Sequence, residues 1–293
     1  MYYTGNEIYR PPLEARTVLL EVTRGCSHNK CSFCTMYKNT PFSKAPEENI
    51  ISDLEEVAFY YPDLERIYLL NGDPFALSFE KLKKLGDLIH SHLPKIKTIT
   101  SYASFYNLKN KSVEELKELK ALHFDELYIG VETAYEDALE KINKACNLEE
   151  YKEGLNKLKK AGISYHAILM MGVAGAGKSI ENALATAEFL NLYPPKSVFP
   201  MTTSVQYGSE LYKMREEGNF VEASLGEIIK EQIVLVENLK LNDDALFSSG
   251  HMVNLVNVSH TWKNKRKILE KLNYALEELS PDLLKSTNQR QAR

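Results

Sequence analysis

Apolar positions follow two alternating patterns along the chain. Six short β-like runs recur, and they span residues 17–22, 66–70, 98–101, 127–131, 164–171 and 198–204. Stretches with apolar residues three or four positions apart follow the runs, as expected for helices. Two such stripes cover residues 50–61 and 148–158. The runs start roughly 30 to 50 residues apart, which is the size of a βα unit.

Repeated βα units predict a parallel sheet whose connections are right-handed crossovers. Six units are enough for an open doubly wound sheet or for a partial barrel. In both architectures, the loops after the carboxyl ends of the strands build the active site. Functional side chains are therefore expected directly after the six runs.

The pattern changes after about residue 222. Two helical stripes follow, at residues 228–239 and 268–279. We therefore predict a βα domain over residues 1–222 and a helical C-terminal extension over residues 223–293. The last residues, 285–293, have no apolar pattern and are expected to form a frayed tail.

Composition and charge narrow the class of protein. The chain has 293 residues, of which 44% are hydrophobic and 26% charged, as in ordinary globular proteins. A net charge of −4 argues against a dedicated nucleic-acid binder. No N-terminal apolar stretch follows a basic region, and no run approaches the length of a membrane span, so neither a signal peptide nor a membrane-spanning segment is expected. A cytoplasmic protein with reduced cysteines is expected, and clustered cysteines then suggest metal binding or catalysis.

Three of the four cysteines lie within nine residues, as Cys26-x4-Cys31-x2-Cys34. They begin four residues after the first β-like run, on a loop of the kind that builds active sites. A zinc site usually takes four ligands, and His28 could supply the fourth. Thiols without metal are a second alternative. A [4Fe–4S] cluster with three irons held by protein uses three thiolates and leaves one iron open to another ligand.

This cysteine loop resembles that of the radical S-adenosylmethionine (SAM) superfamily. In that family three cysteines after the first strand hold a [4Fe–4S] cluster, and SAM chelates the open iron. The resemblance implies that Cys26, Cys31 and Cys34 are the cluster ligands and that Phe33, before the third cysteine, helps to seat the adenine. The usual first spacing is three residues, whereas this chain has four.

Further motifs follow in the order of the same family. The turn Asn71-Gly72-Asp73 resembles the Gly-Gly-Glu-like turn that binds the SAM amino group. Glu132 ends a run similar to the Gly-Ile-Glu-Ser signature of the branch with oxygen-independent coproporphyrinogen oxidase, the methylthiotransferases and the Elongator catalytic subunit. Residues 206–220 are similar to a segment after the sixth strand of that branch. The resemblance implies a partial (β/α)6 TIM-like barrel with a helical C-terminal extension.

A glycine-rich stretch at residues 172–179 also matches the P-loop pattern, with Lys178 at the phosphate-binding lysine. A P-loop nucleotide-binding protein with a structural zinc site is therefore the alternative function. The stretch follows the fifth run, however, where the radical SAM branch has a Gly-Leu-Pro-Gly-Glu-Thr turn near the adenine. Under that resemblance Gly172 and Gly175 contact SAM.

Other polar or reactive side chains lie near the expected strand ends, but their residue types do not indicate a substrate. Cys146 is a possible hydrogen-atom donor and His251 a possible acid or base, although a lone cysteine or histidine is more often structural. The remaining candidates are Arg24, Tyr102, Ser104, Met171 and Gln206.

The resemblance implies an enzyme that cleaves SAM reductively to a 5′-deoxyadenosyl radical. Such an enzyme takes its electron from a reductase, a flavodoxin or a ferredoxin. Oxidation, decarboxylation, carbon–sulfur bond formation and methylthiolation all start from this radical, so the substrate is unknown. A third alternative is a non-catalytic scaffold on a degenerate barrel.

Overall fold

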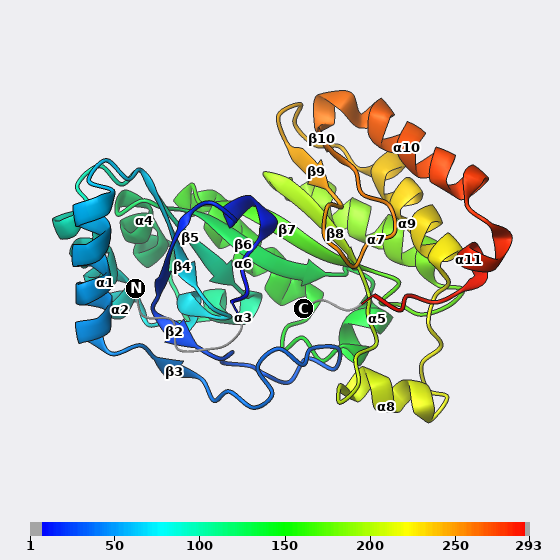
Figure 1. The fold of residues 1–293 in the computed structure, drawn as a ribbon, viewed down its shortest axis with the longest axis horizontal. Coiled ribbons are helices and arrows are strands. Elements are labelled where there is room, and N and C mark those ends of the chain that lie inside the picture. Colours follow the sequence, from blue (N-terminus) through cyan, green and yellow to red (C-terminus); the bar gives the residue numbers. More distant parts are fainter. Residues whose placement is uncertain (1–7, 291–293) are drawn as a thin grey trace. The chain divides into compact units, whose positions relative to one another are not determined.

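The computed structural model describes residues 8–290 (Figure 1). The chain divides into two compact units. Unit 1 contains residues up to 29, together with residues 36–129 and 149–165. Unit 2 contains residues 30–35, 130–148 and those from 166 onward. The division passes through the cysteine loop and through the fourth and fifth β-like runs, at residues 129/130 and 165/166. It does not test the sequence-based boundary at residue 222, which stays a prediction.

The parallel strands of unit 1 follow one another in the order β1-β4-β5-β6. Their bounds are Val18–Glu21, Arg66–Leu70, Thr98–Ala103 and Phe124–Glu132, the last of which continues into unit 2. All four were expected from the apolar runs. A short antiparallel pair, β2 (Thr23–Arg24) and β3 (Ser43–Lys44), flanks the cysteine loop and was not expected.

The helices of unit 1 present their apolar stripes to these strands. In α1, Leu54 and Val57 are buried, while Phe59 and Tyr60 on another face are exposed. Ser104 and Ser112 begin α3 and α4 with capping boxes, which fix where each helix starts. The helices are η1 (Pro12–Glu14), α1 (Glu47–Tyr60), η2 (Pro74–Ala76), α2 (Phe79–His92), α3 (Phe105–Lys109), α4 (Val113–Ala121) and α6 (Leu148–Ala161).

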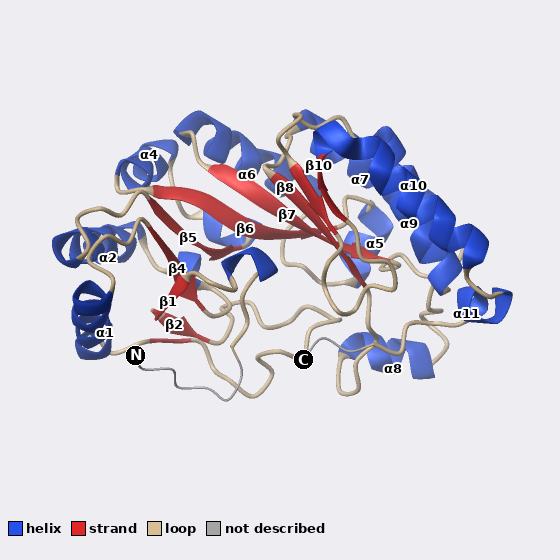
Figure 2. Cartoon of the chain, turned by 45° about the horizontal axis from the view of Figure 1, so that its top comes forward, coloured by secondary structure: helices blue, strands red, loops and turns tan. Residues whose placement is uncertain are grey.

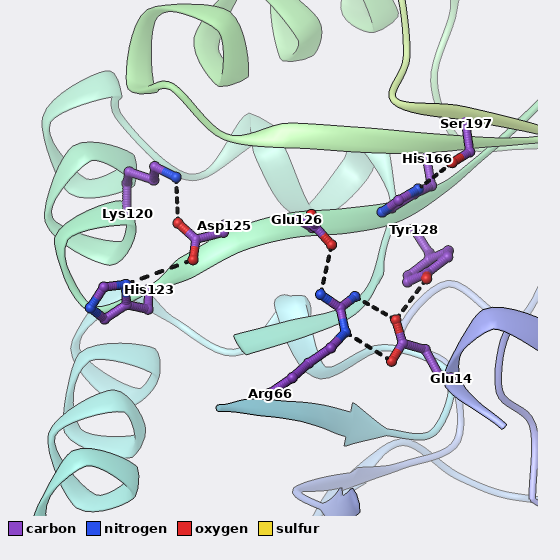
Figure 3. Close-up of polar contacts among 9 residues, drawn as sticks. All are labelled: Glu14, Arg66, Lys120, His123, Asp125, Glu126, Tyr128, His166 and Ser197. Carbon is purple, nitrogen blue, oxygen red and sulfur yellow. Dashed lines mark hydrogen bonds and ion pairs between the residues drawn. The ribbon is translucent and has the colours of Figure 1, made fainter. Parts of the chain in front are cut away.

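A charged cluster joins η1 to the strands of unit 1 (Figure 3). Arg66 on β4 binds Glu14 at 2.5 Å and Glu126 on β6 at 2.9 Å. Tyr128 donates a hydrogen bond to Glu14 at 2.7 Å. Burial opposes ionisation of Glu14, but the hydrogen bonds from Arg66 and Tyr128 more than offset it and lower the pKa of Glu14. The cluster therefore satisfies buried charges at the start of β4 and β6.

The strands of unit 2 continue the βα series. β7 (Ser164–Met171) pairs in parallel with β8 (Ser197–Thr202), and both were expected. The C-terminal residues then add β9 (Leu246–Ser248) in parallel to β8 and β10 (Ser259–Thr261) antiparallel to β9. The 223–293 segment is therefore not purely helical, because two short strands that were too brief to leave a clear sequence pattern extend the sheet of unit 2.

Helix α9 lies at the centre of the helical layer of unit 2 and packs on α7, α10 and α11 (Figure 2). Nine of its residues are buried, which is more than a single apolar stripe of a surface helix would contain. The reason is that neighbouring elements cover α9 on several sides. The helices are α5 (Glu136–Lys141), α7 (Ser179–Leu192), α8 (Glu210–Glu216), α9 (Leu225–Asn238), η3 (Trp262–Asn264), α10 (Lys265–Glu278) and α11 (Pro281–Lys285).

The C-terminal residues are held in place, contrary to the expected frayed tail. Asn288 is buried, and its side-chain amide donates to the Ser204 hydroxyl at 3.2 Å. The backbone N–H of Leu225 donates to the Ser286 carbonyl at 2.8 Å. Polar side-chain and backbone hydrogen bonds order this segment, which an apolar pattern cannot reveal. Residues 291–293 of the expected tail lie outside the described residues.

Across residues 8–290, every helix is too short or too polar to cross a membrane.

Candidate functional site

Cys26 lies in unit 1, on the loop that follows β2. Gly25 has a φ of +69°, and a Cβ there would lie 2.5 Å from the Thr40 carbonyl oxygen, so only glycine fits this turn. After the cysteine, the backbone N–H of Ser27 donates to Asp73 Oδ2 at 2.9 Å, and the Ser27 hydroxyl donates to the same oxygen. Asp73 thus fixes the backbone next to Cys26.

The turn Asn71-Gly72-Asp73 follows β4 and packs on the cysteine loop. The side-chain amide of Asn71 donates to Glu21 Oε2 at 3.0 Å and to the Thr23 carbonyl at 3.1 Å. Gly72 leaves room for the Tyr37 ring, with which a Cβ would clash. Burial raises the pKa of Asp73 although the hydrogen bonds from Ser27 oppose this. Two predicted site segments of unit 1, which are 46 residues apart, are therefore brought together.

Lys111 is a buried lysine beside this turn, and no sequence pattern predicted its burial. Its ammonium group donates to the Phe75 carbonyl at 2.9 Å and lies 4.9 Å from the centre of the Phe75 ring. Burial lowers the pKa of Lys111 to about 8, and the opposite charge of Asp73 works against that shift. The Lys111 charge therefore favours the ionised form of Asp73.

Cys31 and Cys34 lie in unit 2, on residues 30–35. Between them, the buried Ser32 forms three hydrogen bonds. Its N–H donates to the Ile142 carbonyl at 2.9 Å, its hydroxyl donates to the Lys141 carbonyl at 2.9 Å, and its carbonyl accepts from the Leu211 N–H at 2.8 Å. The end of α5 and the start of α8 thereby hold the turn that carries both cysteines.

Glu132, at the end of β6, forms a largely buried ion pair with Lys144, with 2.6 Å between Oε1 and Nζ. The backbone of Glu132 is left-handed, with a φ of +61°, which is unusual for a residue other than glycine. A Cβ at Gly130 would overlap Glu132 Oε1 and lie 2.7 Å from Lys144 Nζ. The Lys144 ammonium group also lies 6.0 Å from the centre of the Phe33 ring. Two predicted SAM contacts, Phe33 and Glu132, thus share Lys144.

The glycine turn after β7 is closed by carboxylates of the same chain. Gly172 and Gly175 have left-handed backbones, with φ of +81° and +87°. The N–H of Gly177 donates to Glu227 Oε1 at 2.7 Å, and the exposed Lys178 pairs with Glu181 at 3.3 Å. A carboxylate therefore takes an amide that a P-loop would offer to phosphate.

The remaining candidates have local roles in this structure. The Ser104 hydroxyl caps α3, and Arg24 pairs with Glu21 at 3.1 Å. The Nδ1 atom of His251 accepts from the Val253 N–H at 3.3 Å, and burial lowers the pKa of His251.

Gln206 accepts a hydrogen bond from the Thr35 hydroxyl, next to Cys34. Tyr102 packs edge-on against Tyr68 and Tyr128, Met171 is buried in β7, and Cys146 is buried before α6.

The donor chemistry of the cysteine loop fits an iron–sulfur cluster, since three thiols follow one strand within nine residues. Across residues 8–290, no three His, Cys, Asp or Glu side chains are gathered in a way that could hold a metal ion. Cys26 belongs to unit 1 and the other two cysteines to unit 2. The ligand set is therefore a proposal that depends on the sequence spacing and on the family.

The sequence analysis did not identify Glu231, a buried carboxyl group beside the glycine turn, as a candidate. Glu231 on α9 is fully buried and accepts from the Gly172 N–H at 2.8 Å. A signal was present, because Glu231 lies three residues after Ile228 and four before Leu235, on the apolar stripe of the helix. A charged residue on a stripe predicted to be buried needs a hydrogen-bonded partner.

The sequence model of the radical SAM superfamily matches residues 20–190. The heme chaperone HemW of Bacillus subtilis is 30% identical over 192 residues, which are 59% of this chain and 50% of that protein. The chain spans about half the length of the curated relatives it matches.

Solved structures show the fold. Methylornithine synthase (PylB) superimposes with a TM-score of 0.54 and 16% identity, over 77% of this chain and 63% of that chain. Coproporphyrinogen III oxidase (HemN) of Escherichia coli, described as a radical SAM enzyme, gives a TM-score of 0.55 at 15% identity, over 75% of this chain and 52% of that chain. The predicted α/β fold with a mostly parallel, partial TIM-like barrel is confirmed.

The superfamily uses a [4Fe–4S] cluster and SAM, as the cysteine loop predicted. Neither the structure nor the comparisons support the alternative of a P-loop protein with structural zinc. The match covers more than half of the chain and includes the cysteine loop, the Asn71 turn and Glu132. The chain belongs to the radical SAM superfamily.

Proposed function

We propose that the chain is a radical SAM enzyme in which Cys26, Cys31 and Cys34 hold a [4Fe–4S] cluster. The observation that carries this proposal is the match of the superfamily to residues 20–190, within which the three cysteines follow β1 and β2. When bound, the cluster supplies the electron that cleaves SAM to methionine and a 5′-deoxyadenosyl radical.

The residues around Cys26 position its thiol. Gly25 makes the turn before it, and the two hydrogen bonds from Ser27 to Asp73 hold the turn after it. A carboxylate at Asp73 has further lone pairs, so it can also accept a hydrogen bond from the SAM amino group. We therefore assign Asp73 two roles, one toward the loop and one toward SAM, with Asn71 and Gly72 setting the shape of its turn.

In unit 2, the proposed adenine side of the site is built around Lys144. This ammonium group binds Glu132 and lies over Phe33, which limits the positions that both side chains can take. The ion pair with Lys144 thereby sets the orientation of the Glu132 carboxylate. Gly172 and Gly175 take left-handed backbones, which residues with a Cβ rarely adopt, and they thereby shape the turn that is proposed to face the adenine.

The proposed reaction needs one electron for each SAM molecule, and a reductase, a flavodoxin or a ferredoxin is the proposed donor. A cytoplasmic location, which would keep the thiols reduced, is part of the same proposal.

The proposal is tested with the three variants Cys26→Ala, Cys31→Ala and Cys34→Ala, reconstituted anaerobically with iron and sulfide. In each variant, 5′-deoxyadenosine formation should fall by roughly a hundredfold or more, because a missing ligand removes the cluster or changes its reduction potential. Cys146→Ala, outside the loop, should keep its iron. Retained 5′-deoxyadenosine formation in all three loop variants would show that these cysteines do not hold the cluster.

A further inference from the structure

Helix α9, which lies beyond the last motif of the family resemblance, carries a carboxyl group into the turn after β7. Glu231 is fully buried. Its Oε2 accepts the backbone N–H of Gly172 at 2.8 Å, and its Oε1 accepts the side-chain amide of Asn182 on α7. Both carboxyl oxygens are therefore used.

The network continues from Asn182 to the end of β6. The Thr133 hydroxyl donates to Asn182 Oδ1, and Thr133 is the residue after Glu132. One turn further along α7, the Thr186 hydroxyl accepts the Ala134 N–H at 3.1 Å. A chain of hydrogen bonds thus runs from α9 through α7 to the backbone that carries Glu132.

The turn itself lies close to α9. A Cβ at Gly172 would lie 3.0 Å from Cγ1 of Ile228, which is one turn before Glu231 on the helix. Glu227, on the same face, accepts the Gly177 N–H at 2.7 Å. Two carboxyl groups of α9 therefore hold the two ends of the glycine turn.

A carboxyl group is a costly choice for packing alone. A leucine at position 231 would continue the apolar face of α9 without desolvating a polar group. What the carboxyl group adds is a pair of acceptor atoms at fixed positions, and these are bonded to Gly172 and Asn182.

We propose that Glu231 is a positioning residue for SAM, which holds the glycine turn in register with the end of β6 without touching SAM itself. This inference rests on the proposed function, in which Gly172, Gly175 and Glu132 contact SAM. It makes the 223–293 segment part of the SAM site rather than an appendage to it.

The test compares Glu231→Leu, Glu231→Gln and Gln232→Leu in the full chain loaded with its cluster. Gln232 is the matched control, since it is buried on the same helix and its side-chain carbonyl oxygen has no hydrogen-bond partner among residues 8–290. The Kd of SAM is measured by equilibrium dialysis and kcat at saturating SAM. Amide hydrogen exchange at Gly172 is followed in parallel, with iron content as the check on the cluster.

Glu231→Leu should weaken SAM binding about tenfold or more, as for other supporting hydrogen-bond partners, with kcat changed less than about twofold. It should also speed exchange of the Gly172 amide. Glu231→Gln keeps one acceptor, so its Kd for SAM and its Gly172 exchange rate should lie between those of Glu231→Leu and the wild type. Gln232→Leu should match the wild type in both quantities.

An unchanged Kd in Glu231→Leu, or an equal loss in Gln232→Leu, would overturn the inference while leaving SAM cleavage by the wild type intact. Loss of kcat at an unchanged Kd would overturn it too. A wild-type chain that loads its cluster and does not bind SAM would refute the proposed function, and the inference with it.

Discussion

At the residue scale, neighbouring residues hold Glu132 of the candidate site in its position. Glu132 keeps a left-handed backbone, which costs free energy in a residue other than glycine, and its carboxylate is held by Lys144. The pair exists because Gly130 has no side chain. The sequence pointed to Glu132 through a motif, but it could not show the role of Lys144, twelve residues away.

Gly130→Ala should therefore separate stability from SAM binding. The added methyl group displaces the flexible ends of Glu132 and Lys144, so the fold should survive. The Kd of SAM should rise about tenfold, equivalent to about 1.4 kcal/mol. Gly250→Ala is the matched control, because the nearest atom to its added Cβ lies 3.4 Å away. Equal SAM affinities for both variants, measured by equilibrium dialysis, would contradict this reading of the ion pair.

Glu231 predicts a specific pH dependence of stability. Burial, which outweighs the hydrogen bonds from Asn182 and Gly172, raises the pKa of Glu231 from 4.5 to about 8. Between these pH values the folded chain keeps a proton that the unfolded chain has released. Stability therefore falls as pH rises through this window, by roughly 1 kcal/mol per pH unit, and this contribution is fully retained only below the unfolded pKa.

Glu231→Gln cannot ionise, so it should flatten this part of the curve of unfolding free energy against pH. Urea denaturation between pH 5 and about 8 measures the slope. Glu237→Gln, exposed on the same helix, should follow the wild type. If the wild type and Glu231→Gln have parallel curves, Glu231 is already ionised in the folded chain.

At the element scale, the apolar runs predicted the strands well because each is buried and follows a regular βα repeat. β4 and β7 have the predicted bounds, and β1, β5, β6 and β8 differ by a few residues at their ends. The strands β9 and β10 were missed because three residues leave no periodic signal. The turn that carries Cys31 and Cys34 was also unpredictable in detail, since α5 and α8, far away in sequence, hold it.

Ser32→Ala should loosen this turn. The change leaves the Lys141 carbonyl without the Ser32 hydroxyl, at a cost of about 1 kcal/mol. The iron retained per chain after desalting should fall, because the turn between two proposed cluster ligands is less ordered. Ser91→Ala, which removes a hydroxyl that donates to the Leu88 carbonyl on the exposed face of α2, is the control. Equal iron retention in both variants would contradict a supporting role for Ser32.

At the scale of the whole molecule, sequence motifs and fold point to the same family. The motifs came in the order of the strands, and the superfamily match and the solved structures confirmed the family and the fold. The contribution of the C-terminal segment was not predictable. Glu227 and Glu231 accept hydrogen bonds from the glycine turn in a geometry that depends on α9 packing against α7, and a local apolar pattern does not reveal that packing.

The most direct measurement is the formation of 5′-deoxyadenosine by the full chain. The chain is reconstituted anaerobically with iron and sulfide, reduced with dithionite and mixed with SAM, and the product is quantified by mass spectrometry. We predict about four irons per chain together with 5′-deoxyadenosine. Zinc in place of iron, or a four-iron protein that leaves SAM intact after reduction, would contradict the central claim that this chain is a radical SAM enzyme.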